Sequence, residues 1–217
     1  MMMMMMRKLL TFVLPVGLAA CASGLMGSAL AQAGAASAAK AERPDVKVGD
    51  RWKFACAEGR KKSDRLWVVT SVDLTGVKGT WNGQPLAMTL DLNEVDSPEH
   101  TNTDKRLLSF PLEVGKQWTS SNKFVDHTNK DVKGSEKYSV RVADYGKVRV
   151  PAGEFDTFKL KAKSSFTAED GSAGTHEFTY WYAPAARAVV KGMDQVTWQG
   201  GGWPETTCEL VEFQLQP

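Results

Sequence analysis

The chain has 217 residues, of which 42% are hydrophobic and 24% are charged, and its formal net charge is +2. Two of the basic residues, Arg7 and Lys8, belong to an N-terminal leader that export would remove, so the rest of the chain is formally neutral. A neutral chain lacks the basic excess typical of proteins that bind nucleic acids or adhere electrostatically to anionic lipid. Neither function class is therefore expected.

The N-terminal segment predicts export. Arg7 and Lys8 precede an apolar run from Leu9 to Ala20, and small residues follow it. A short basic head, an apolar core and a small-residue cleavage region are typical of a secretory signal peptide, here residues 1–20, rather than of a membrane span. We therefore expect the rest of the chain to lie in the bacterial cell envelope, in the periplasm.

The end of the leader allows two processing products. Leu18-Ala19-Ala20-Cys21 resembles the bacterial lipobox, whose cysteine is lipidated and becomes the first mature residue. On this interpretation Cys21 is the lipid-attachment site, and the protein contacts a membrane, such as the outer membrane, only through that anchor. The alternative is a leader that ends at Ala31, where Ala29-Leu30-Ala31 offers small residues to an ordinary signal peptidase. That cleavage would discard Cys21 and release a soluble periplasmic protein.

The mature chain divides into a tether and one domain. Residues 21–43 are rich in Ala, Gly and Ser. Such a composition buries too little apolar surface to offset its ordering entropy, so we expect a flexible tether. Residues 44–217 suffice for a single β domain with one core, because domains of about 100–200 residues are ordinary.

From residue 44 onward, apolar and polar residues alternate in the way that is typical of antiparallel strands with one buried face. Thr175 to Tyr182, for example, places His176, Phe178, Tyr180 and Tyr182 on one face. Comparable runs are residues 65–72, 138–142, 158–163 and 208–213.

Turn signals separate these runs, among them the hairpin signals Asn82-Gly83 and Asp170-Gly171. Residues 90–105 are an exception: they are polar and acidic and include Pro98, which predicts a long loop with room for one helical turn. About 11–12 strands in so short a chain must close or curl to protect their edges. The predicted fold is all-β, an antiparallel sheet curled into a barrel or half-barrel with little helix.

Cys56 and Cys208 are the two cysteines of the predicted domain. In an oxidising compartment, an even pair far apart in sequence predicts a disulfide, here between the first and the last predicted strand. Two buried free thiols are the alternative.

A short pattern occurs twice. Residues 48–52 and 114–118 share the motif Val-Gly-x-x-Trp. It predicts a glycine turn that leads into a strand whose early tryptophan closes one end of the core. The motif fits either a duplicated half or the convergent use of one turn chemistry.

Three segments, at residues 110–118, 148–159 and 180–184 with 189–191 downstream, follow one another in a specific order and spacing. Together they resemble the DUF3108-like group of bacterial envelope proteins, which is defined only as a domain of unknown function. The resemblance covers about residues 108–192. It implies an exported, mostly β protein, similar in shape to the open barrels of lipoprotein-carrier proteins, and it implies no catalytic residues.

The sequence contains no motif for catalysis or metal binding. His100, His127 and His176 lack the spacing of metal ligands, so we expect solvent-exposed or loop histidines. Residues 91–96 are acidic but lack the glycine and the final glutamate of a calcium loop. No nucleophile motif occurs. We therefore predict no catalytic residue, no metal, no cofactor and no enzymatic activity. Scattered carboxylates leave a hydrolase of envelope polymers as a third hypothesis.

Seven tryptophans are many for one domain. Most are expected in the core, whereas Trp198 and Trp203, which flank a run of three glycines, are candidates for the mouth of a concave ligand site. The leading hypothesis is a non-enzymatic envelope protein that binds an apolar small molecule, a lipid or a glycan, or docks an envelope partner. The second hypothesis is a passive structural or interaction module with a solid interior.

Overall fold

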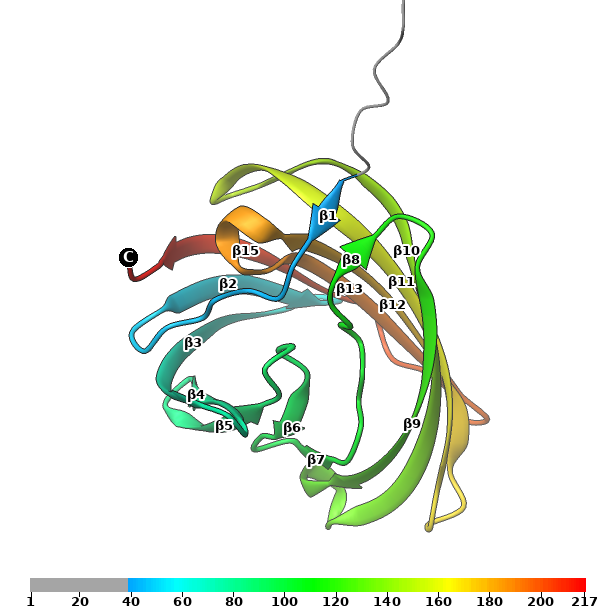
Figure 1. Cartoon of the computed structure of the whole chain (residues 1–217). Coiled ribbons are helices and arrows are strands. Elements are labelled where there is room, and N and C mark those ends of the chain that lie inside the picture. Colours follow the sequence, from blue (N-terminus) through cyan, green and yellow to red (C-terminus); the bar gives the residue numbers. More distant parts are fainter. Residues whose placement is uncertain (1–38) are drawn as a thin grey trace, which may run out of the picture. The chain divides into compact units, whose positions relative to one another are not determined.

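The computed structural model describes residues 39–217, which form a closed barrel of twelve antiparallel strands (Figure 1). The ring closes where β12 pairs with β13. The all-β fold and the number of strands predicted from the sequence are therefore confirmed. In order around the barrel, the strands are β12 (Ala173–Ala183), β11 (Gly153–Ala168), β10 (Val132–Val150), β9 (Gln117–Asp126), β7 (His100–Asn102), β6 (Glu94–Asp96), β5 (Gln84–Met88), β4 (Gly76–Trp81), β3 (Lys61–Asp73), β2 (Arg51–Glu58), β15 (Thr206–Gln214) and β13 (Ala188–Trp198).

The remaining elements are small. Strand β14 (Gly201–Gly202) pairs with the end of β13, and β1 (Lys40–Ala41) pairs with β8 (Leu112–Glu113). The helical segments among residues 39–217 are two 3-10 turns, η1 (His127–Asn129) and η2 (Pro184–Ala186).

Ordered structure begins before the domain boundary predicted at residue 44. Ala41 of β1 is only 3% exposed and lies opposite Leu112, which is fully buried. An alanine is small enough to be enclosed in this way even within a segment whose composition favours a tether. The predicted signal peptide, the lipid-attachment site Cys21 and the tether up to residue 38 lie outside the described residues.

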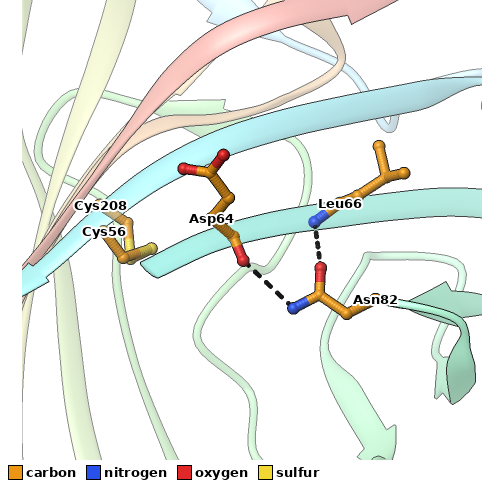
Figure 2. The surroundings of a disulfide bond; sticks show 5 residues. All are labelled: Cys56, Asp64, Leu66, Asn82 and Cys208. Carbon is orange, nitrogen blue, oxygen red and sulfur yellow. Dashed lines mark hydrogen bonds between the residues drawn. A yellow bond between two sulfur atoms is a disulfide. The ribbon is translucent and has the colours of Figure 1, made fainter. Parts of the chain in front are cut away.

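The strands follow the alternation in the sequence. Tyr138, Val140 and Val142 of β10 are buried, and the residues between them are exposed. At the Asn82-Gly83 hairpin both residues have positive φ, 50° and 81°, as a tight two-residue turn requires. The Asn82 side-chain oxygen Oδ1 also accepts from Leu66 N, in β3, at 2.7 Å (Figure 2).

The prediction of a long loop at residues 90–105 is wrong in part, because this stretch contributes two barrel strands of three residues each, β6 and β7. No turn of helix occurs within it. Strands this short carry no readable alternation. β6 pairs with the nearby β5, and β7 pairs with the more distant β9.

The two Val-Gly-x-x-Trp segments adopt one geometry. Gly49 and Gly115 both have a φ of +92°, and each amide donates to a carbonyl of the next long strand, Val69 O or Val142 O, at 2.9 Å. The strand that follows carries a register shift directly after Val69 in one case and after Val142 in the other. The two segments therefore share a turn geometry, which fits either a duplicated half or the convergent use of one turn chemistry.

One end of the barrel, where β2 and β9 begin, is filled by apolar side chains; we call it the sealed end. Trp52 stacks on Trp67 with ring centroids 4.3 Å apart, and its indole N–H donates to Ala186 O at 2.7 Å. The largest fully buried apolar side chains are Trp52, Tyr182, Phe158, Leu112, Leu160, Leu210, Val69, Val140, Val142 and Val190.

The chain between β7 and β8 runs along the inner side of β9 (Figure 1). Two inward side chains of β9 hold it: Asn122 Oδ1 accepts from Thr103 N at 2.9 Å, and Trp118 Nε1 donates to Arg106 O at 2.9 Å. Asn93 accepts from the Leu107 and Leu108 amides at 2.8 and 2.7 Å. These contacts hold Lys105, which lies outside any strand, on the inner side of the barrel wall.

Cys56 of β2 and Cys208 of β15 are directly opposite one another and form a disulfide, the pair predicted from the sequence (Figure 2). The bond spans 152 residues of chain. It joins the first long strand to the last, as that prediction proposed.

Candidate functional site

The interior of the barrel has two chemically different halves. Opposite the sealed end lies the end where the turns between β2 and β3, β4 and β5, and β11 and β12 are located; we call it the hairpin end. Cross-strand partners share a face of the sheet, so the register identifies the inward residues near this end. Many of them are polar, and we call these the polar half: Arg65, Glu94, Lys105, Glu136, Tyr138, Ser164, His176, Tyr180 and Asp194. Apolar side chains share this face, since Phe166, Val196 and Phe178 lie directly opposite Glu136, His176 and Asp194.

Glu136 is the centre of a buried hydrogen-bonded group. The Tyr138 hydroxyl donates to one oxygen of its carboxylate, and the Ser164 hydroxyl donates to the other. Burial and the adjacent Glu136 carboxylate raise the pKa of Tyr138 well above its ordinary value. Tyr138 is therefore a permanent hydrogen-bond donor in this half of the barrel.

Lys105 and Glu94 form an ion pair with an Nζ to Oε2 distance of 2.9 Å. The Ser97 hydroxyl also donates to Glu94, at 2.5 Å. Burial opposes ionisation of both groups, but their mutual attraction outweighs it: the pKa of Glu94 is lowered and that of Lys105 is raised. Both side chains are therefore charged at neutral pH.

Asp194 differs from Glu94 in its surroundings. Burial raises the pKa of its carboxyl group, against the opposing effect of the nearby Arg65 guanidinium. Arg65 itself lies over the Trp81 ring, 5.1 Å from the centroid. A carboxyl, a guanidinium and an indole face thus converge on one part of the polar half.

His176 lies on the inward face of β12, beside Phe178, with ring centroids 3.7 Å apart. The expectation of an exposed or loop histidine was wrong for this residue, because the alternation that makes Phe178 and Tyr182 inward also makes His176 inward. Burial, with the positive charge of Lys105 nearby, lowers the pKa of His176 to about 3. The ring is therefore neutral at physiological pH.

Several polar atoms of the interior have no protein partner. Among residues 39–217, four buried side-chain polar atoms make no hydrogen bond: His176 Nε2, Asn102 Nδ2, Ser120 Oγ and Trp67 Nε1. Buried polar groups in folded proteins are normally hydrogen-bonded, so each such atom indicates a group available to water or to a ligand.

A pocket of about 350 Å³ reaches the Lys105–Glu94 pair from the side of the barrel, between the β3–β4 turn and the chain that follows β7. Its other charged residues are also paired with one another. The Arg43–Asp91 and Arg106–Asp104 ion pairs measure 2.5 and 3.1 Å. Because every cation here already has an anion, the pocket offers hydrogen bonds rather than a net charge.

Trp198 and Trp203 lie together at the hairpin end. Trp198 ends β13, opposite Gly174, and its ring meets that of Trp203 edge to face with centroids 5.3 Å apart. Trp203 is 57% exposed. The two tryptophans proposed for a mouth thus lie at the same end of the barrel as the polar half.

Sequence reasoning missed the charged members of the polar half. Glu136 and Asp194 could have been found from the alternation of their strands. Glu136 lies two residues before the inward Tyr138, and Asp194 lies two residues after Gly192, which is opposite the inward Tyr180. No signal existed for Lys105, which lies outside any strand.

Within residues 39–217, no group of three or more His, Cys, Asp or Glu is arranged to hold a metal ion. That part of the chain also contains no helix long and apolar enough to cross a membrane.

The neutral state of His176 leads to a pH prediction. The ring stays neutral in the folded barrel down to about pH 3 but takes up a proton near pH 6.5 in the unfolded chain. Acid therefore favours the unfolded chain, and this residue lowers the free energy of unfolding by about 2 kcal/mol between pH 7 and pH 5. Urea unfolding of wild type and His176→Gln at both pH values measures the effect. The variant should lose less stability on acidification, and equal losses would show that the ring is not buried and neutral.

The barrel is similar to solved structures at low sequence identity. A protein from Bacteroides fragilis, assigned as exported and with a YmcC-like fold, superposes with a TM-score of 0.51 at 13% identity, covering 80% of this chain and 99% of that one. A protein from Parabacteroides distasonis, assigned as a lipoprotein, gives 0.49 at 12% identity, with coverage of 80% and 99%. The hypothetical lipoprotein YmcC from Escherichia coli gives 0.46 at 9% identity, with coverage of 75% and 84%.

No protein-family model and no curated protein matches the chain. The resemblance to the DUF3108-like group thus remains a prediction. The likeness to the Bacteroides fragilis protein shows a shared fold, that of a YmcC-like barrel.

Proposed function

We propose that this protein is an exported, non-enzymatic barrel of the bacterial cell envelope that binds a hydroxyl-rich ligand, a saccharide, in the polar half. The observation that carries the proposal is the contrast between the two halves of the interior. Inward side chains at the sealed end are apolar and buried. In the polar half, Glu136, Tyr138 and Ser164 are also buried, whereas Arg65, Tyr180 and Asp194 remain partly accessible to solvent. Charged groups on the inner face of a barrel are costly unless they are paired or reached by water, and a ligand site explains why they occur there.

The chemistry of the polar half favours a saccharide over an acyl chain. Carboxylates and a guanidinium are partners for hydroxyl groups, and the Trp81 and Tyr180 rings offer apolar faces to sugar C–H groups. An acyl chain would instead have to lie against Glu94, Lys105 and Asp194 and remove their hydration, which is unfavourable. Of the apolar molecule, lipid or glycan expected from the sequence, the glycan fits best.

The envelope location has three supports. Residues 7–21 have the pattern of an export signal that precedes a lipidation site. The disulfide is of the kind that persists in oxidising compartments. The Bacteroides fragilis protein that shares the fold is assigned as exported. A soluble periplasmic form and a form anchored through Cys21 are both compatible with a barrel that binds its ligand at the hairpin end.

Tryptophan fluorescence titrated with a panel of neutral oligosaccharides, and separately with fatty acids, tests this function. Saccharides should quench the emission in a saturable way and fatty acids should not. Asp194→Asn should weaken saccharide binding about 10- to 100-fold, since a hydrogen bond to a charged group contributes about 1.5–3 kcal/mol.

The matched control is Asp64→Asn, which makes the same chemical change at a side chain that is 68% exposed on the outer surface. It should bind as the wild type does. Saturable binding of fatty acids alone, or an equal loss in both variants, would contradict the saccharide site. Binding of neither ligand class would favour the passive structural module.

A glycoside hydrolase is the second candidate. Glu94, Glu136 and Asp194 all lie within electrostatic range of Lys105, and the environment lowers the pKa of Glu94 while it raises that of Asp194. Carboxyl groups whose pKa values are driven apart are the usual acid and base of such enzymes. Chromatography of the oligosaccharides after incubation separates the two functions: intact ligand supports binding alone, and shortened ligand supports hydrolysis.

A further inference from the structure

The outer surface of β9 and of the adjoining parts of β10 and β11, toward the hairpin end, is strongly basic. These three neighbouring strands form the right-hand wall of the barrel in Figure 1. Between the hairpin end and the register shift at Val142/Asp144, their outward positions are 117, 119, 121, 123 and 125 on β9, 133, 135, 137, 139 and 141 on β10, and 161, 163, 165 and 167 on β11. No acidic residue occupies any of these positions. We call their basic residues the basic face: Lys123, Lys133, Lys137, Arg141, Lys161 and Lys163. Beyond the shift both signs of charge occur, because the exposed Asp144, Glu154 and Asp156 belong to that part of β10 and β11.

The basic face is arranged at a cost to the fold. Arg141 and Lys161 are direct cross-strand partners on the same face, and like charges in this position destabilise a sheet. Of the six residues, only Lys163 has an ion-pair partner within residues 39–217, the Glu177 carboxylate at 2.5 Å. Surfaces that serve solubility alone usually mix both signs of charge, so this arrangement indicates an anionic partner.

We infer that the basic face docks an anionic polysaccharide. Successive cations lie about 13 Å apart along β10 and about 7 Å apart along β11, at the rise of an extended strand. Serine and threonine hydroxyls at positions 119, 121, 135, 139, 165 and 167 lie between them and are exposed. Alternating cations and hydroxyl groups on an extended surface complement a chain that repeats carboxylates and hydroxyl groups.

An anionic membrane fits this surface less well. Peripheral membrane surfaces combine basic residues with apolar side chains that insert between lipids. Val125 is the one apolar residue among the outward positions of the basic part of the three strands, and it is half-buried. The most exposed large apolar side chain among the described residues, Leu74 at 97%, lies on the β3–β4 turn, away from the basic face.

Polygalacturonate, a linear polyuronate, is the probe for this surface. Wild-type protein should bind it in 50 mM NaCl by surface plasmon resonance or microscale thermophoresis, and affinity should fall at least about tenfold in 500 mM NaCl, because added salt screens exposed charges. Neutral dextran should not bind. The triple variant Lys137→Glu, Arg141→Glu, Lys161→Glu should lose at least about tenfold in affinity, since three positive charges of the basic face become negative and repel the polyanion.

The matched control reverses three exposed basic residues elsewhere, Arg60→Glu, Lys62→Glu and Lys78→Glu, with the same change in net charge. It should keep most of the affinity. Far-UV circular dichroism and the melting temperature confirm that both triple variants fold. Asp194→Asn should bind polygalacturonate as the wild type does, so the failure of the interior site and the failure of this surface are distinguishable.

Three results would overturn the inference. One is the absence of polygalacturonate binding in 50 mM NaCl. Another is an equal loss of affinity in the two triple variants, which would show that net charge alone matters. The third is binding to phosphatidylglycerol vesicles without binding to polygalacturonate, which would assign the basic face to a membrane.

Discussion

The double variant Cys56→Ala, Cys208→Ala is expected to unfold with a free energy about 5 kcal/mol lower than that of the wild type, as the chain-entropy relation gives for a loop of this length. The disulfide closes 152 residues, nearly the whole described chain, so its loss greatly enlarges the ensemble of the unfolded state. Guanidinium chloride unfolding followed by tryptophan fluorescence measures the difference.

The reducing agent provides the control for this variant. Wild-type protein unfolded in dithiothreitol should shift toward the double variant, and the double variant should be insensitive to dithiothreitol. Equal unfolding midpoints of wild type and double variant without reductant would show that the two cysteines are not joined in solution.

Replacement of Asp50 by Ala is expected to cost about 3–5 kcal/mol, the range for removal of one partner of a buried ion pair. The Asp50 side chain is fully buried and accepts from Gln216 N at 2.6 Å, from Lys47 N at 3.0 Å and from Arg187 at 3.2 Å. It thus connects the start of the barrel, the turn after η2 and the C-terminal segment. Its loss leaves the two amides without their acceptor and the Arg187 guanidinium with Gln216 O, at 3.4 Å, as its remaining partner.

Thermal and urea unfolding of Asp50→Ala measure this cost, and Asp45→Ala is the matched control. The Asp45 side chain is 84% exposed and pairs with Lys47 only at 3.7 Å, so its removal should change stability by no more than about 0.5 kcal/mol. The double variant Asp50→Ala, Arg187→Leu should recover part of the loss, since it also removes the unpaired cation. An Asp50→Ala protein as stable as the control variant would refute the buried network.

The long strands could be predicted because their burial pattern is local. Alternation in residues 138–142 and 175–182 reports directly which side chains face inward, and the structure buries Tyr138, Val140, Phe178 and Tyr182 accordingly. The paired glycine turns before Trp52 and Trp118 were likewise readable, because positive φ favours glycine.

The short strands and the position of Lys105 could not be predicted from a local pattern. β1, β6 and β7 have two or three residues each, too few for a period to be seen. Lys105 lies inside the barrel because Asn93, Trp118 and Asn122 bind the backbone on either side of it.

Composition also concealed how the charges are distributed. A formally neutral chain predicts no strong electrostatic surface, but the sum does not say where each sign lies. Here the carboxylates of Glu94, Glu136 and Asp194 face the interior, whereas six cations share the outer surface of three strands. The distribution follows from strand phase, so assigning each charge to a face of its strand would have shown it.

A crystal structure of the protein with its tightest-binding neutral oligosaccharide tests most directly whether the hairpin end of the barrel is a ligand site. We expect sugar density in contact with Asp194 and Arg65, and only protein side chains at the sealed end around Trp52. Sugar bound solely on the outer surface, or a polar half collapsed onto itself without sugar or ordered water, would contradict the proposed function.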